Sequence, residues 1–244
     1  MVHVGTSGYS YPEWRGTFYP ERFPPARMLA HYAERFHTVE LNNTFYRMPT
    51  AKTIAAWDQD TPPGFVFALK VPRRITHIAR LRDVDRPFRY LLDTVGALGL
   101  KLGPLLLQLP PTLRKDAARL GDCLALVPPG VRMAVEFRHA SWLDDGVYGI
   151  LRAWNVALCV ADTEAGTTPV VVTADFGYLR FRDRAYAREE LLGWAATARR
   201  AAWRDAFVYF KHEESGTGPA LAWELVGLLD AAAGGRPALP EASP

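Results

Sequence analysis

The 244-residue sequence has few cysteines, no long apolar run and no strong excess of either charge. Its two cysteines, Cys123 and Cys159, lie far apart and near no His/Cys cluster, which excludes a disulfide framework and a cysteine-rich zinc site. Two buried, reduced thiols are expected instead. No apolar segment approaches the roughly 20 residues that a bilayer crossing needs, and the chain starts without a basic leader. These absences predict a cytoplasmic protein with no membrane partner.

The chain carries 29 basic and 26 acidic residues, a formal net charge of +3, and nearly all the basic residues are arginines. An excess this small does not predict nucleic-acid binding, which needs basic residues concentrated on one face. Genome composition is an equally good explanation of the arginine content. Apolar residues make up 49% of the chain and charged residues 23%, which is ordinary globular usage.

Short β-type runs alternate with helix-type stretches along the chain. Eight strands are predicted, at residues 3–7, 38–42, 65–71, 104–109, 133–138, 156–162, 176–182 and 206–211. Each is followed by a helix except the sixth, where the helix is weak or missing. Such alternation predicts a parallel sheet covered by helices. Eight units favour a closed TIM-type (β/α)8 barrel over an open doubly wound sheet, which usually has fewer strands and a glycine-rich phosphate turn.

No Gly/Ser-rich linker interrupts this alternation. Residues 1–233 are therefore predicted to form a single barrel domain. Residues 234–244 contain three prolines and no periodicity, which predicts a flexible C-terminal tail.

Residue parity along the strands predicts which side chains face the barrel interior. In the third strand the bulky residues Phe65, Phe67 and Leu69 share one face, so Lys70 points inward at the carboxyl end. The same reasoning gives a set of inward polar residues near the other strand ends: Glu40, Asn42, Gln108, Glu136, Arg138, Asp162, Tyr178, Arg180, Arg182, and either Lys211 or His212. Active sites of this architecture lie at the carboxyl ends of the strands. The set predicts a functional mouth, and an ion-paired belt without function is the alternative.

Five separated motifs of unusual composition occur along the chain: Gly5–Trp14, Thr38–Tyr46, Lys70 with Ile75–His77, Gly103–Pro111, and Glu136–Trp142. Together they resemble the YecE-like family, also called domain of unknown function 72. The resemblance implies a TIM-type barrel and supplies no reaction, because the activity of the family is not established. The sequence departs from the commoner family pattern at Arg180–Asp183 and Tyr209–Glu213, which makes the mouth more cationic.

The mouth residues support more than one chemistry. Glu40 and Glu136 are candidate acid/base groups, and because their strands lie nearly opposite each other, a wide separation with room for a water is expected, as in inverting glycoside hydrolysis. Neighbouring cations would lower their pKa values, which disfavours that reaction. The cations suit a phosphate or carboxylate. With Glu40, Glu136 and Lys70 as catalytic residues, hydrolysis or transfer on a small anionic substrate is the preferred prediction.

The residues expected to bind that substrate come from strand ends and the loops after them: Ser7, Tyr9, Asn42, Tyr46, His77, Gln108, Arg138, His139, Trp142, Asp162, Arg180, Arg182 and Lys211. The aromatic members either stack on a substrate or cap the core. No cofactor is predicted, although His77, His139 and His212, with the carboxylates at the strand ends, allow a divalent metal. The alternatives are therefore a metal-dependent phosphodiesterase, a nucleic-acid-binding protein and a noncatalytic binding module. No Walker, Rossmann or Gly-x-Ser-x-Gly motif occurs.

Overall fold

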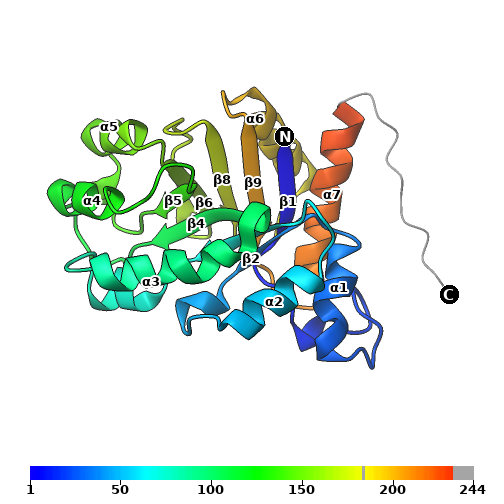
Figure 1. The fold of residues 1–244 in the computed structure, drawn as a ribbon. Coiled ribbons are helices and arrows are strands. Elements are labelled where there is room, and N and C mark those ends of the chain that lie inside the picture. Colours follow the sequence, from blue (N-terminus) through cyan, green and yellow to red (C-terminus); the bar gives the residue numbers. More distant parts are fainter. Residues whose placement is uncertain (183–184, 233–244) are drawn as a thin grey trace.

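The computed structural model describes residues 1–182 and 185–232, and the predicted tail at 234–244 lies outside them. Eight parallel strands form the barrel: β1 (Val2–Thr6), β2 (Thr38–Leu41), β3 (Val66–Lys70), β4 (Leu102–Gln108), β5 (Met133–Glu136), β6 (Ala157–Thr163), β8 (Phe176–Phe181) and β9 (Asp205–Phe210). They lie in the order β1-β9-β8-β6-β5-β4-β3-β2 (Figure 1). The Gly8 amide donates to the Glu40 carbonyl at 2.7 Å, which joins β1 to β2 and closes the sheet. The predicted TIM-type barrel is confirmed.

Helices surround this sheet (Figure 1). The α-helices are α1 (Met28–Ala33), α2 (Ala51–Gln59), α3 (Asp85–Val95), α4 (Ala117–Leu124), α5 (Asp145–Ala153), α6 (Arg188–Arg200) and α7 (Thr217–Ala232). Residues 164–175 contain no helix and only the short strand β7 (Gly166–Thr167), which pairs antiparallel with β6. The missing helix after the sixth barrel strand is therefore confirmed. None of the helices in the described ranges is long and apolar enough to cross a bilayer.

Short helical turns connect several of these elements. They are 3₁₀ turns at Pro12–Trp14, Pro25–Arg27, Asn43–Phe45, Gly96–Lys101 and Ala140–Trp142, and a π-helical turn at Arg74–Ile78. Three α-helices follow an N-cap residue whose side chain accepts a backbone N–H: Thr50, Asp116 and Asp144. These caps fix where α2, α4 and α5 begin after the carboxyl ends of their strands.

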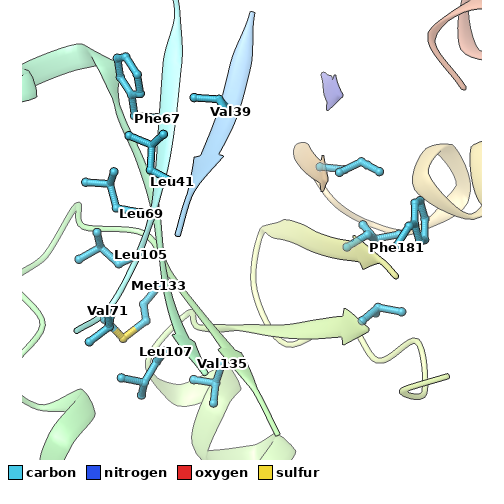
Figure 2. Close-up of a cluster of buried hydrophobic side chains, with 14 of the residues drawn as sticks. Val39, Leu41, Phe67, Leu69, Val71, Leu105, Leu107, Met133, Val135 and Phe181 are labelled. Atoms are coloured by element: carbon cyan, nitrogen blue, oxygen red, sulfur yellow. The ribbon is translucent and has the colours of Figure 1, made fainter. Parts of the chain in front are cut away.

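The main core lies between the strands and the helices. Figure 2 shows its sheet side, where alternate residues of neighbouring strands, such as Val39, Phe67, Leu105 and Val135, point away from the barrel axis. All four are completely buried. This face is continuous because a strand of a parallel barrel is apolar wherever it meets a helix.

A second cluster fills the barrel itself. It contains Val66, Ala68, Leu106, Ala134, Ala157, Cys159, Ala174, Phe176, Tyr178, Phe207 and Tyr209. Val66 and Ala68 share the parity of Lys70, so the predicted orientation of the third strand is confirmed. Phe207 and Tyr209 share the parity of Lys211, which makes Lys211 the inward residue of the last strand.

The parity assigned to Asp162 is wrong. Ala157 and Cys159 face the interior, so Ala161 and Thr163 continue that face and Asp162 lies on the opposite one. Its carboxylate accepts a hydrogen bond from Thr167 of β7. Asp162 therefore holds the hairpin after β6 instead of lining the barrel.

Candidate active site

One guanidinium organises the carboxyl-terminal end of the barrel, which we call the mouth. Arg180 of β8 is 1% exposed. Its Nε and Nη2 donate to the two carboxylate oxygens of Glu40 at 2.8 Å each, and its Nη1 donates to Glu136 Oε2 at 2.5 Å. The space between the two carboxylates is thus filled by Arg180. The expectation of a gap that holds a water between Glu40 and Glu136 is wrong, because a cation bridges their strands.

Glu40 has no lone pair left for a substrate. Its Oε1 also accepts from Ser7 Oγ at 2.5 Å and Asn42 Nδ2 at 3.2 Å, and its Oε2 accepts from the Tyr178 hydroxyl at 2.7 Å. Burial by itself raises the pKa of Glu40, but the charge of Arg180 and these hydrogen bonds outweigh it, so the net shift is downward. Because Glu40 accepts five hydrogen bonds and has no exposed surface, its role is to orient Arg180.

Glu136 is less completely occupied. Its Oε1 accepts from Gln108 Nε2 at 2.7 Å and Arg138 Nε at 3.0 Å, and among the described residues its Oε2 accepts only from Arg180. Burial opposes ionisation, yet Arg180 and Arg138 lower the pKa of Glu136 to about 2. The carboxylate is ionised at all physiological pH values.

A cavity of about 570 Å³ opens beside Glu136, at the carboxyl ends of β5 and β6. Two cations line it, Arg138 and Arg182. Arg138 uses only Nε on Glu136, and its side chain is 34% exposed. The Arg182 guanidinium is half-buried and has no hydrogen-bond or ion-pair partner among the residues that the structure describes. Both cations can therefore meet a ligand in this cavity.

Lys70 ends β3 and is half-buried in the mouth. Its Nζ lies 4.1 Å from the centre of the Phe45 ring, and the His77 ring packs edge-on against the same Phe45 at 4.9 Å. Within residues 1–182 and 185–232, no carboxylate oxygen lies within 4 Å of this ammonium. Burial, followed by the charge of Arg180, lowers the pKa of Lys70 to about 8.

Several predicted site residues lie at the edge of the mouth. Tyr46 is 74% exposed on the loop after β2. The His139 Nδ1 accepts from the Ser141 amide, and His139 lines the same cavity as Arg182. Lys211 lies 3.5 Å from Glu213, so its charge is partly matched.

Two aromatic residues do not reach the cavity. Trp142 has no exposed surface, donates its indole N–H to the Leu113 carbonyl and stacks on Phe137. Tyr9 packs against the core beside Tyr32. The prediction that Trp142 contacts a substrate is corrected. The side chain belongs to the main core between the strands and the helices, which agrees with the alternative that the aromatic residues cap the core.

The mouth contains one segment that was not predicted from the sequence, and one predicted interior residue whose partner was not. The hairpin from Thr163 to Thr168 forms one wall of the cavity, and Tyr178 donates to Glu40. The hairpin could have been expected from the missing helix after the sixth strand. When a connection forms no helix on the outside of the barrel, its residues are free to fold over the mouth. Tyr178 was assigned to the interior, but its partner lies across the barrel.

The described part of the chain holds no group of three or more His, Cys, Asp or Glu side chains that could bind a metal ion. His139 lines the cavity together with Glu136, whereas His77 packs against Phe45. The donor set near the cavity is dominated by cations, which suits an anion better than a divalent metal.

Comparison with known proteins gives the same fold. The family model described as Protein of unknown function DUF72 matches residues 3–244. The UPF0759 protein YecE of Escherichia coli K12 is 29% identical over 147 residues, which are 60% of this chain and 52% of YecE. The UPF0759 protein YunF of Bacillus subtilis is 26% identical over 160 residues, 61% of this chain and 54% of YunF. The chain spans about half the length of the curated relatives it matches.

Two solved structures are also similar. A DUF72 family protein from Thermotoga maritima has a TM-score of 0.82 at 27% identity, over 94% of this chain and 99% of that one. A xylose isomerase domain protein from Alicyclobacillus acidocaldarius has a TM-score of 0.55 at 13% identity, over 96% of this chain and 100% of that one. The second likeness shows a shared barrel fold and carries no activity to this chain.

Proposed function

The chain belongs to the DUF72 family of TIM barrels, and we propose that it is an enzyme of the hydrolase or transferase type that acts on a small anionic or phosphate-bearing substrate at the mouth. The observation that carries this proposal is unmatched positive charge beside a cavity. Arg180 and Arg138 are bonded to the two buried carboxylates, whereas Arg182, which lines the cavity, has no acidic partner among the described residues. Lys70, which ends β3 and is not part of the cavity lining, also has no carboxylate partner there. A ligand with negative charge would supply what these cations lack.

Arg138 and Arg182 are the proposed anion-binding residues. A guanidinium presents paired N–H donors that match the oxygens of a phosphate or carboxylate. The Nε of Arg138 is held by Glu136, which leaves its terminal nitrogens without a hydrogen-bond acceptor in the described structure. The bond to Glu136 thus fixes the direction of Arg138 before a ligand arrives, and this pre-organisation supports tight binding.

The acid/base roles divide according to how each group is bonded. Glu40 is saturated with donors, so we assign it to positioning Arg180. Glu136 touches the cavity, but a carboxylate with a pKa of about 2 is a weak base. Of the three predicted catalytic residues, Lys70, with a pKa of about 8, titrates nearest to neutral pH and is the preferred proton-transfer group.

The binding part of this proposal is tested by calorimetric titration with inorganic phosphate. Arg182→Met should weaken phosphate binding by about tenfold or more, the size of one lost charge-assisted contact. Arg204→Met is the matched control, because Arg204 pairs with Asp175 at the opposite end of the barrel. Equal phosphate binding by wild type and Arg182→Met would overturn the assignment.

The catalytic part is tested with a panel of phosphate and carboxylate monoesters. Lys70→Met should abolish turnover while leaving the melting temperature almost unchanged. Phosphate binding without turnover of any ester or group-transfer substrate would make the mouth a noncatalytic binding site. Binding of a single-stranded oligonucleotide that weakens steeply with salt, and stronger than binding of phosphate, would favour the nucleic-acid alternative.

A cytoplasmic location is also part of the proposal. Both Cys123 and Cys159 are free and buried, which suits a reducing compartment.

A further inference from the structure

Lys70 differs from the four other lysines of the chain in its surroundings. Lys101, Lys115 and Lys211 each have a carboxylate oxygen at 2.8, 2.5 and 3.5 Å, respectively. Lys52 is exposed on the helix surface. Only Lys70, among these five described residues, is half-buried without a carboxylate within 4 Å.

The side chains around Lys70 favour a neutral amine. Its Nζ lies 4.1 Å from the centre of the Phe45 ring, and the His77 ring packs edge-on against the same Phe45. Arg180 and Arg138 repel the ammonium form, while Glu40 and Glu136 attract it from beyond ion-pair distance. Burial is the largest effect and lowers the pKa to about 8. At pH 7.5 roughly a quarter of Lys70 is then the free amine, against about 0.1% of an ordinary lysine.

We propose that Lys70 is a nucleophile that forms an imine with a substrate carrying both an aldehyde or ketone group and an anionic group. The inference rests on the proposed function, because the anionic group would bind at Arg138, whose charge acts directly on Lys70. It selects the transferase type within that function, since an imine is the usual means of moving a carbon group through a covalent intermediate.

The chemistry needs no oxidant or reductant. The Nζ lone pair attacks the carbonyl carbon and forms a C–N bond, the carbonyl oxygen takes up protons, and it leaves as water. The product is a protonated imine, so the net reaction joins the amine, the carbonyl compound and one proton and releases one water. In a β-hydroxy substrate the iminium then accepts the electron pair of the Cα–Cβ bond, and the β-carbon fragment leaves as an aldehyde after its hydroxyl gives up a proton. The enamine so formed attacks the carbonyl carbon of an acceptor aldehyde, whose oxygen takes up that proton, and hydrolysis of the new iminium releases the product and the free amine.

The neighbouring cations are compatible with this step. The substrate's anionic group offsets the charge of Arg138 and Arg182, and the iminium carries the same charge as the ammonium that Lys70 would otherwise be. Phe45 stabilises that cation through its ring face. The competing role for Lys70 is to stay protonated and contact a phosphate. A reductant traps an imine as a stable secondary amine, whereas an ammonium–phosphate contact leaves no covalent product.

Reductive trapping tests the inference. The wild-type protein is incubated at pH 7.5 with cyanoborohydride and, in separate arms, glyoxylate, glycolaldehyde phosphate or uncharged propanal, and the modified lysines are located by peptide mass spectrometry. Lys70 should be modified at least tenfold faster than Lys52, the exposed internal control. Both anionic aldehydes should exceed propanal at Lys70, and the faster of the two identifies a carboxylate or a phosphate as the anionic group. Added phosphate should slow labelling of Lys70 only.

Lys70→Arg keeps the positive charge but cannot form an imine. It should lose the adduct and retain phosphate binding, whereas Lys52→Met should keep both, with folding checked by thermal unfolding. Wild-type protein that binds phosphate but gives no preferential adduct at Lys70 would overturn the inference and leave the proposed function standing. Failure to bind phosphate would overturn the proposed function itself. Equal labelling by propanal, or labelling unaffected by phosphate, would refute the anionic carbonyl substrate.

Discussion

Replacing Arg180 with methionine should be one of the most damaging substitutions in the mouth. Methionine approximates the arginine stem, so the change removes the charge and three hydrogen bonds, two to Glu40 and one to Glu136. Both carboxylates stay buried. Removing one partner of a buried ion pair costs about 3–5 kcal/mol, because the remaining charge is left desolvated. For a chain of this length that lowers Tm by roughly 6–20 °C.

The pH dependence of stability should also change sign. In the wild type the pKa of Glu136 is about 2 in the folded state, below the ~4.3 of an unfolded glutamate, so its contribution is complete above that unfolded value and is lost as the pH falls towards 2. Without Arg180, burial raises the folded pKa of Glu40 above its unfolded value. The variant's folded state is then favoured at acidic pH, and this contribution is lost as the pH rises through the raised pKa.

Urea unfolding between pH 4 and pH 8 measures both effects. Arg180→Met should lose most stability at pH 7 and less at pH 4. Arg204→Met removes the same charge from an exposed pair with Asp175 and should cost about 1 kcal/mol or less at every pH. A loss of under 1 kcal/mol for Arg180→Met, or a profile parallel to that of the wild type, would show that Arg180 does not neutralise the carboxylates as described.

Two further predictions concern packing. A Cβ on Gly5 would lie 2.2 Å from the Thr38 carbonyl oxygen, where β1 meets β2, so Gly5→Ala should destabilise the barrel by more than about 2 kcal/mol. Gly149 lies in α5 with open space around it, so Gly149→Ala should stabilise the protein by about 0.5–1 kcal/mol. Calorimetric unfolding of the two variants measures both effects. Burial raises the pKa of the Cys123 and Cys159 thiols, so Ellman's reagent should react with neither in the native state and with both in guanidinium; fast native reaction would contradict their burial.

The alternation of strands and helices was enough to predict the barrel. Each strand and helix can be recognised from its own segment, because an apolar run of four to seven residues indicates a strand and a following amphipathic stretch indicates a helix. Even the exception after the sixth strand could be read, because residues 164–175 lack helical periodicity. Closure by the contact of β1 with β2 follows once eight such units are counted.

Parity gave the direction of side chains where one face of a strand is bulky. It worked for β3, where Phe65, Phe67 and Leu69 form the helix-facing side. It failed for Asp162, because β6 is apolar on both faces and only residue size separates them. The small Ala157 and Cys159 fit the narrow interior.

The sequence by itself determined the barrel, the cationic character of its mouth and most of the residues there. Only the tertiary structure decided how they are paired. Glu40 and Arg180 are 140 positions apart, and nothing local indicates that one guanidinium joins two carboxylates from different strands. That pairing satisfies the glutamates and leaves Lys70 without a carboxylate. The reason is physical: hydrogen bonds and pKa shifts depend on distances across the closed barrel, and sequence spacing does not specify those distances.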